Sequence, residues 1–120
     1  MDCLFCKIIS NDISAYKIYE DNLVLAFLDI NQDAPGHTLI VPKKHHADYL
    51  ELDKDLFNHI IEVAKKINDD IFKKLKAEGS SFVWNYGISQ EIKHFHLHIL
   101  PKYKNKPVLK DEEIFNILTK

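Results

Sequence analysis

The stretch His94-Phe95-His96-Leu97-His98-Ile99-Leu100 alternates three histidines with apolar residues. On a β-strand, a period of two places all the imidazoles on one face and all the apolar groups on the other. The apolar face would pack on the core. The imidazoles, spaced roughly 6.5 to 7 Å apart along the strand, are too far apart for one metal ion to bind all three easily, but they suit contacts with different parts of one ligand. An exposed strand face that is rich in histidine is the simpler alternative.

The segments around these histidines predict further strands and one long helix. Apolar positions recur at helical spacing from Asp53 to about Lys76, with Asp53 able to serve as the N-cap and Gly79 just beyond the end. The fold class is therefore α+β: an antiparallel five-stranded sheet packed with one long helix, in a single domain over residues 1–120. The expected strands are 17–19, 23–28, 38–41, 81–86 and 92–100, and the expected short helices are 4–9 and 111–118.

Composition narrows the partners that the chain can bind. Its 120 residues include sixteen lysines and no arginine, with a net charge of −2. A nucleic-acid polymer is disfavoured because domains that bind one carry a basic excess. Any phosphate group must be held by backbone N–H groups, histidine, hydroxyls or lysine. No run approaches the roughly 18 apolar residues of a membrane-spanning helix, and the first residues lack the basic region of a signal peptide, so we expect a cytoplasmic protein without membrane association.

Several segments, in the correct order along the chain, resemble those of the histidine-triad (HIT) superfamily. The histidine stretch is similar to its His-φ-His-φ-His-φ-φ signature, in which φ is apolar. The resemblance covers roughly residues 3–101 and is closest to the Hint branch. It implies a HIT-like fold, a homodimer, purine nucleotides as ligands and no organic cofactor. The other segments that carry it are Leu4-Phe5-Cys6-Lys7-Ile8-Ile9, Ala26-Phe27-Leu28-Asp29-Ile30, Pro35-Gly36-His37-Thr38-Leu39-Ile40-Val41-Pro42-Lys43-Lys44-His45 and Asn85-x-Gly87.

The resemblance implies catalytic roles for three histidines. His96 would attack the α-phosphate and form a nucleotidyl-histidine intermediate that water resolves. A neutral imidazole can attack phosphorus, and a ring with an ordinary pKa near 6.5 is mostly neutral at pH 7. His98 would contact the phosphate oxygens and help to protonate the leaving group, while His37 would orient the cluster from a neighbouring strand. For His37, a histidine at a strand start with its own hydrogen bond is the alternative.

A nucleotide-binding site is implied in the same way. Asp29 matches a carboxylate that accepts hydrogen bonds from the ribose hydroxyls, with an ordinary turn cap as the alternative. Asn85 and Gln90 resemble amides beside the phosphate. An apolar slot for the base is also implied, and plain core positions are the alternative, above all for Ile8 and Ile30. The slot residues are Leu4, Phe5, Ile8, Phe27 and Ile30.

Cys3 and Cys6 are three residues apart, which in a reducing compartment suggests a metal pair or a redox pair before a structural disulfide. By resemblance to zinc-containing relatives, His45 and His94 would complete a tetrahedral, structural Zn²⁺ site with the two thiolates. A redox Cys-x-x-Cys and two buried inert thiols are the alternatives.

Glu91 departs from the Hint pattern, in which a serine usually follows the glutamine matched by Gln90. An ionised carboxylate 4 Å from a phosphate would be repelled by roughly 1 to 4 kcal/mol, depending on the effective dielectric. Pointing into solvent is the simpler expectation for Glu91. The alternative places it at the leaving-group side of the nucleotide site, where it would favour a cationic amine.

The expected function is that of a nucleotide-binding hydrolase, a phosphoramidase-like enzyme. It would cleave the bond at the α-phosphate of purine nucleoside phosphoramidates or related nucleotides. Hydrolysis of dinucleoside polyphosphates, as in the Fhit branch, is an alternative because it uses the same triad. A nucleotide-binding scaffold protein with incidental catalysis is the alternative from a different class.

Overall fold

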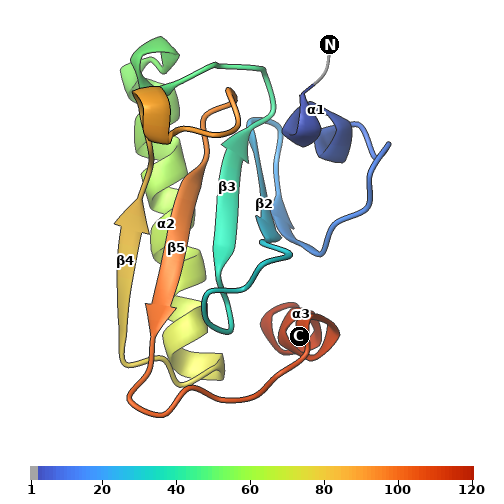
Figure 1. The fold of residues 1–120 in the computed structure, drawn as a ribbon, viewed down its shortest axis with the longest axis vertical. Coiled ribbons are helices and arrows are strands. Elements are labelled where there is room, and N and C mark those ends of the chain that lie inside the picture. The colour runs from blue at the N-terminus through green and yellow to red at the C-terminus, as the bar shows by residue number, and fades with distance from the viewer. Residues whose placement is uncertain (1–2) are drawn as a thin grey trace.

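The computed structural model describes residues 3–120, and over these residues it shows a five-stranded antiparallel sheet with three α-helices (Figure 1). The strand order is β1-β2-β3-β5-β4, so the last two strands exchange places relative to their order in the chain. The predicted α+β class with one long helix is confirmed. The strands are β1 (Lys17–Glu20), β2 (Val24–Leu28), β3 (Thr38–Pro42), β4 (Gly79–Val83) and β5 (Leu97–Lys102), and the helices are α1 (Leu4–Ile9), α2 (Lys54–Lys74) and α3 (Asp111–Leu118).

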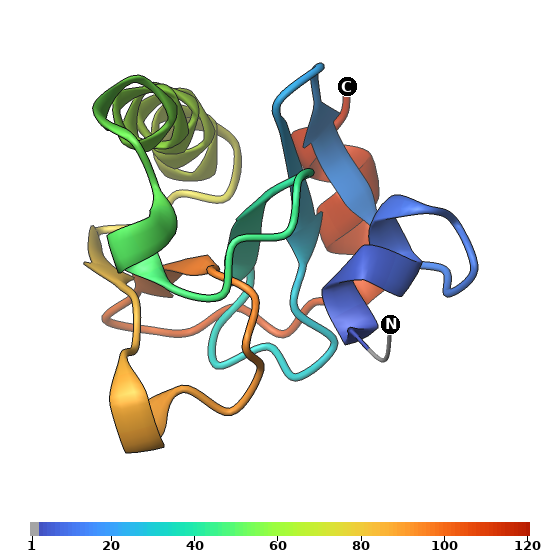
Figure 2. The same cartoon turned by 90° about the horizontal axis from the view of Figure 1, so that it is seen from above.

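Both faces of the central strands β2 and β3 are buried, because their residues alternate between two cores. Val24, Ala26 and Leu28 of β2 belong to one core, while Leu25 and Phe27 belong to the other. The first core includes residues of α2 and α3, and the second includes residues of α1. Figure 2 shows α2 and α1 on opposite sides of the sheet. Burial on both faces is the reason that β2 reads as a continuous apolar run in the sequence.

The histidine stretch enters the sheet later than predicted. The expected strand 92–100 is observed as Leu97–Lys102, so the first two histidines precede the ladder of β5. In that part the backbone N–H of Phe95 donates to the carbonyl of His46 at 2.7 Å, which holds the stretch against the chain that follows β3. The predicted alternation is confirmed, since the apolar residues between the histidines all enter the core shared with α2.

The edge strand β4 also differs from its predicted bounds. It is observed at Gly79–Val83 rather than 81–86. Beyond Val83 the chain leaves the ladder, and the Trp84 ring packs against Phe57 at 5.7 Å and Phe95 at 6.2 Å between ring centroids. The β-prone residues after Val83 therefore serve tertiary packing.

Helix α2 begins as predicted and ends differently. The side chain of Asp53 accepts a hydrogen bond from Leu56 N at 2.8 Å, as an N-cap does. After the helix, Lys76 takes the left-handed conformation with φ 62°, whereas Gly79 is the first residue of β4. The Lys76 Nζ donates to the Lys73 carbonyl, which offsets part of the roughly 1 to 2 kcal/mol that this conformation costs. Although α2 has 21 residues, no helix within residues 3–120 is long and apolar enough to cross a membrane.

Gly36 lets the chain turn into β3. Its φ of +96° lies where side chains cause strain. A Cβ here would lie 2.9 Å from Leu75 Cδ1 and 3.3 Å from Pro101 Cγ. Glycine thus permits both the turn and the close approach of this loop to the end of α2, and together these fix where His37 enters the sheet.

Asp21 joins the β1–β2 hairpin to α2. Its Oδ1 accepts the backbone N–H groups of Leu23 and Val24 at 2.8 and 2.9 Å. Its Oδ2 accepts the Tyr19 hydroxyl and contacts Nε2 of His59, both at 2.7 Å. Burial opposes ionisation of Asp21, but these hydrogen bonds outweigh it and hold the pKa of the carboxyl well below its usual range.

Candidate active site

A pocket of about 390 Å³ lies on the α1 side of the sheet. This volume is typical of sites that hold small organic ligands. Its walls come from α1, the ends of β2 and β3, the loop before the histidine stretch and the stretch itself. The residues predicted from the sequence that line the pocket are Leu4, Phe5, Ile8, Phe27, Asp29, Ile30, Asn85, Glu91, His96 and His98.

Part of the pocket wall had no signal in the sequence. The segment 13–15, which follows α1, lines the pocket although it forms no regular element. This segment reaches the pocket because the chain passes there on its way from α1 to β1. Neither a periodic pattern nor a motif in the sequence predicts that course. Further lining residues that sequence reasoning missed are Leu28, Asn31, Leu39, Ser89 and Ile92.

Gln90 differs from its expected place beside the phosphate. It is buried and does not line the pocket. Its Nε2 donates to the carbonyls of Ala47 at 2.7 Å and Ile92 at 3.1 Å. Backbone carbonyls therefore occupy the amide donor, and Gln90 fixes the loop that carries Glu91.

His96 presents an unprotonated nitrogen to the pocket. Its Nδ1 lies 2.8 Å from the carbonyl of His94, and since a carbonyl only accepts, Nδ1 carries the proton of the neutral ring. Nε2 is then the free base. Burial lowers the pKa of His96, against the hydrogen bond to His94 and the charges of Asp29 and Glu91, so the ring is neutral at pH 7. Phe5 packs edge-on against it at 4.9 Å between ring centroids.

His37 and His98 are joined by a hydrogen bond of 2.9 Å between Nε2 and Nδ1. The backbone N–H of Asp33 donates to Nδ1 of His37 at 3.3 Å, which assigns the His37 proton to Nε2. Nδ1 of His98 is therefore the acceptor, and its Nε2 carries a proton. Burial lowers the pKa of both rings, that of His98 to about 4 with help from the nearby His96 and His37. The arrangement agrees with His37 orienting His98 and supplies an N–H donor at the pocket.

Gln32 clamps the loop between β2 and β3, although no motif or periodicity points to this residue. Its Nε2 donates to the carbonyls of Asp29 and His37 at 2.7 and 2.6 Å. Its Oε1 accepts the backbone N–H groups of Gly36 and His37 at 2.9 and 3.1 Å. One side chain thus fixes the relative positions of the carboxylate and the imidazole at the edge of the pocket.

Asp29 stands at the end of β2 with one oxygen engaged. Its Oδ1 accepts the backbone N–H of Asn31 at 2.9 Å, and its Oδ2 lies 3.5 Å from Nε2 of His37. Asp29 and Glu91 are the charged residues that line the pocket within the described part of the chain, so a ligand meets two carboxylates and no lysine there. This lining disfavours an anionic group placed beside the two carboxylates and favours a cationic one.

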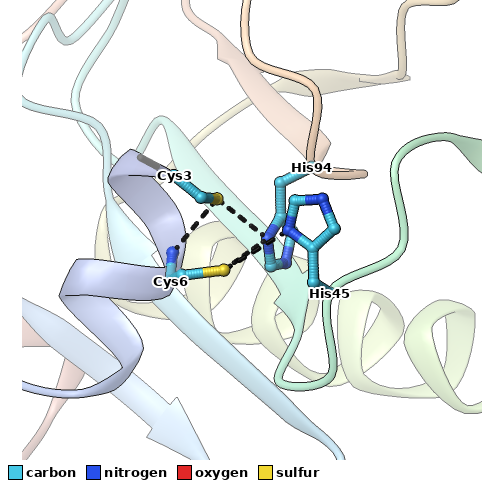
Figure 3. A group of neighbouring side chains, drawn as sticks. All are labelled: Cys3, Cys6, His45 and His94. Atoms are coloured by element: carbon cyan, nitrogen blue, oxygen red, sulfur yellow. Dashed lines mark hydrogen bonds between the residues drawn. The ribbon is translucent and has the colours of Figure 1, made fainter. Parts of the chain in front are cut away.

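The two cysteines and two histidines expected to bind metal converge beside α1 (Figure 3). Sγ of Cys3 lies 3.3 Å from Nδ1 of His94, and Sγ of Cys6 lies 3.3 Å from Nδ1 of His45. One donor atom from each of the four residues lies within 4.8 Å of the other three. Two sulfurs and two imidazole nitrogens at this spacing are a donor set that suits tetrahedral zinc.

The orientation of His94 also suits metal binding by this cluster. Its Nε2 lies 2.8 Å from the carbonyl of Pro42, which places the ring proton there and turns the Nδ1 lone pair toward the sulfurs. Burial and the adjacent Cys3 thiol raise the pKa of Cys6 to about 11. A divalent cation would reverse this effect, because it stabilises thiolates directly.

Comparison with known proteins identifies the family to which the chain belongs. The HIT domain matches residues 10–105, which is most of the chain. The chain therefore belongs to the HIT family.

Individual members of the family are similar over nearly the whole length. An uncharacterized HIT-like protein of Methanocaldococcus jannaschii is 45% identical over 119 residues, covering 96% of this chain and 91% of that protein. The adenosine 5′-monophosphoramidase hnt1 of Schizosaccharomyces pombe is 38% identical over 104 residues, covering 85% of this chain and 75% of that enzyme. A Zn-bound histidine triad family protein of Mycobacterium smegmatis has a TM-score of 0.91 at 31% identity, covering 99% of this chain and 91% of that one.

Proposed function

We propose that this chain is a nucleotide hydrolase that cleaves purine nucleoside phosphoramidates, or related nucleotides, at the α-phosphate. The observation that carries the proposal is the tautomer of His96, whose Nδ1–H is bound by the His94 carbonyl so that Nε2 is free at the pocket. The monophosphoramidase activity in the name of the fission-yeast relative supports the same substrate class.

The reaction would proceed in two displacements. Nε2 of His96 attacks the α-phosphorus, the phosphorus–nitrogen bond to the leaving amine breaks, and a nucleotidyl-histidine forms. A bound anionic phosphate would favour uptake of a proton from solvent by His98, and the resulting imidazolium would pass a proton to the departing nitrogen. Water then attacks the same phosphorus, the bond to Nε2 breaks, and the proton lost by the water returns to His98.

The rest of the pocket would bind the nucleoside. Oδ2 of Asp29 accepts hydrogen bonds from the ribose hydroxyls, since Oδ1 is already engaged by Asn31. The rings of Phe5 and Phe27, whose centroids are 5.6 Å apart, would contact the base, together with Leu4 and Ile8. Asn85 would lie beside the phosphate. These roles give affinity that does not depend on the attacking group.

The position of Glu91 favours phosphoramidates over dinucleoside polyphosphates. A polyphosphate leaving group would bring further negative charge toward a pocket that already holds two carboxylates. At 4 Å one such pair costs roughly 1 to 4 kcal/mol. A leaving amine adds no such charge.

We further propose a structural zinc ion in the Cys3, Cys6, His45 and His94 cluster, on the donor set and spacing described above. The zinc in the mycobacterial relative's name supports it. With four protein ligands the ion would have no open position and would take no part in catalysis.

We propose a homodimer that pairs through the edge strand β4. Strand β4 lies at the end of the strand order, and apolar side chains on and after it are exposed by 36% or more. A symmetric pair that joins β4 and α2 to the same elements of a second copy would cover both the strand edge and these side chains. The exposed residues are Phe82, Val83, Trp84 and Tyr86.

Trapping the intermediate tests the proposed function. The protein is mixed briefly with an adenosine phosphoramidate or a diadenosine polyphosphate, quenched and examined by mass spectrometry. We expect an adenylyl group on His96 and faster turnover of the phosphoramidate. In His96→Ala, turnover should fall by several orders of magnitude while nucleotide affinity stays within about tenfold. Normal turnover in His96→Ala, or an adduct on another residue, would exclude His96 as the nucleophile, and His46→Ala serves as the control.

A further inference from the structure

We infer that Asp29, His37 and His98 form a second site for a divalent transition-metal ion, separate from the cysteine cluster, and that an ion there excludes the nucleotide. One donor atom from each residue lies within 4.8 Å of the other two. Nε2 of His37 is 2.9 Å from Nδ1 of His98 and 3.5 Å from Oδ2 of Asp29. The three atoms converge from the end of β2, the start of β3 and the start of β5.

These separations are close to those around a bound ion. Donor atoms about 2.0 to 2.1 Å from a tetrahedral zinc ion lie about 3.3 Å from one another. The two nitrogens need to separate by a few tenths of an ångström, and the nitrogen–oxygen distance needs to shorten by a similar amount. The third separation, between Nδ1 of His98 and the Asp29 carboxylate, lies within 4.8 Å, and side-chain rotation must bring it to a similar value.

The surrounding backbone suits this use in part. The N–H of Asn31 holds Oδ1 of Asp29, which leaves Oδ2 as the free ligand atom. When Nε2 of His37 binds an ion, the ring proton moves to Nδ1, which accepts the backbone N–H of Asp33 at 3.3 Å in the structure. That long hydrogen bond must then break, because a protonated Nδ1 no longer accepts. The clamp by Gln32 fixes Asp29 and His37 relative to each other.

The donor set selects the kind of ion. Two imidazole nitrogens and one carboxylate oxygen suit zinc, cobalt(II) or nickel(II), whereas magnesium and calcium prefer oxygen ligands alone. His98 and Asp29 line the pocket, so the remaining coordination positions face the space available to a ligand. Three protein ligands with an open position differ from the closed cysteine site, and the ion here should exchange more readily.

An ion in this site would occupy Oδ2 of Asp29 and Nδ1 of His98. The part of the inference that concerns the nucleotide rests on the proposed function, because that function assigns the same carboxylate oxygen to the ribose and the same imidazole to the leaving group. The metal and the nucleotide would then compete, and free transition metal would inhibit the enzyme.

Cobalt(II) distinguishes the two sites by spectroscopy. The full chain is first given one equivalent of zinc, which the cluster with two thiolates binds more tightly than the three-ligand site does, and is then titrated with cobalt(II). We expect about one cobalt ion per chain, with visible d–d absorption and without the near-ultraviolet charge-transfer band of a cobalt–thiolate bond. Adenosine monophosphate should release this cobalt.

Variants decide which residues hold the ion. His37→Gln and Asp29→Asn should each lose the second equivalent, while His59→Gln, which removes a histidine from neither cluster, should retain it. The inference is overturned if the zinc-loaded chain takes up no cobalt, if the cobalt band shows thiolate ligation, or if both site variants still bind it. Cobalt uptake that nucleotide does not reverse would overturn the competition. Failure of the phosphoramidase assay alone would count against the proposed function and leave the metal count as evidence for the site.

Discussion

At the scale of single residues, the two carboxylates that line the pocket favour a positively charged group beside them. Asp29 is held by Asn31 and His37, but Glu91 is exposed at the rim. The negative charge of Glu91 raises the pKa of His96 and so opposes the larger lowering of that pKa by burial. The exposure of Glu91 agrees with the simpler expectation that it points into solvent, while its place in the pocket lining keeps the leaving-group side as a prediction, in which a cationic amine would supply the countercharge.

The substitution Glu91→Gln tests this role. We expect kcat/KM for a phosphoramidate with a cationic amine to fall roughly fivefold, the value of an exposed ion pair of about 1 kcal/mol. An uncharged phosphoramidate should react as before, and high salt should reduce the difference. Glu112→Gln on α3 is the control. Equal effects on both substrates would leave Glu91 without a part in specificity.

At the scale of elements, the conformation of the loop between β2 and β3 depends on the side-chain amide of Gln32. Gln32→Leu removes the donor and the acceptor that hold Asp29, Gly36 and His37. Because the carboxylate and imidazole then lose their common support, we expect kcat/KM to fall by roughly 10- to 100-fold. The melting temperature should also fall, since four backbone contacts lose their partner. The exposed Asn105→Leu is a control, and unchanged kinetics in Gln32→Leu would contradict the clamp.

The β1–β2 hairpin should make stability depend on pH. The folded state holds the pKa of Asp21 below its unfolded value, so its contribution is complete above the unfolded pKa and is lost as pH falls through that value toward the folded one. Asp21→Asn should therefore lower the free energy of unfolding by about 1 to 2 kcal/mol at pH 7, and the deficit should shrink below about pH 4. Urea titrations across this range measure it. Glu62→Gln, whose ion pair with Lys65 is exposed, should show no such trend, and a deficit in Asp21→Asn that is independent of pH would refute the assignment.

The elements also show what the sequence can and cannot report. Period-two alternation and an N-cap are local signals, so the faces of the histidine stretch and the start of α2 were predicted correctly. The ends of β4 and α2 were not, because tertiary packing of Trp84 and a left-handed Lys76 decided them. The clamp by Gln32 and the burial of Gln90 depend on contacts between segments, for which a single amide in a sequence carries no pattern.

At the scale of the whole molecule, the exposed apolar side chains along β4 predict a dimer. Light scattering at micromolar concentration should give twice the chain mass of 14.0 kDa. Trp84→Lys and Val83→Lys should shift the protein toward the monomer, because a charge at a paired edge is costly to bury. Exposed Val108→Lys, away from this edge, is the control. A wild-type protein that stays monomeric would exclude the proposed pairing.

Metal removal tests the proposed zinc site. Elemental analysis should find about one zinc per chain in protein purified without chelator. Chelation, or Cys6→Ser, should lower the melting temperature markedly, since an ion that binds only the folded state stabilises that state. Ser10→Ala, a control at the end of helix α1, which also carries Cys6, should lower the melting temperature less. Metal-free protein of unchanged stability would reject the site.

Helix α1 has only six residues, and it serves both sites: Cys6 faces the proposed zinc site, while Leu4 and Phe5 line the pocket. A nucleotide that packs against Phe5 therefore also restrains the helix that carries a metal ligand. If the bound nucleotide raises the affinity for zinc in this way, thermodynamic reciprocity requires zinc to raise the affinity for the nucleotide by the same factor. Adenosine monophosphate should therefore raise the chelator concentration needed to remove zinc, and zinc-depleted protein should bind the nucleotide more weakly. With the proposed zinc site empty, the short helix would thus lose one of its anchors, and the affinity of the pocket for its ligand would depend on the supply of metal.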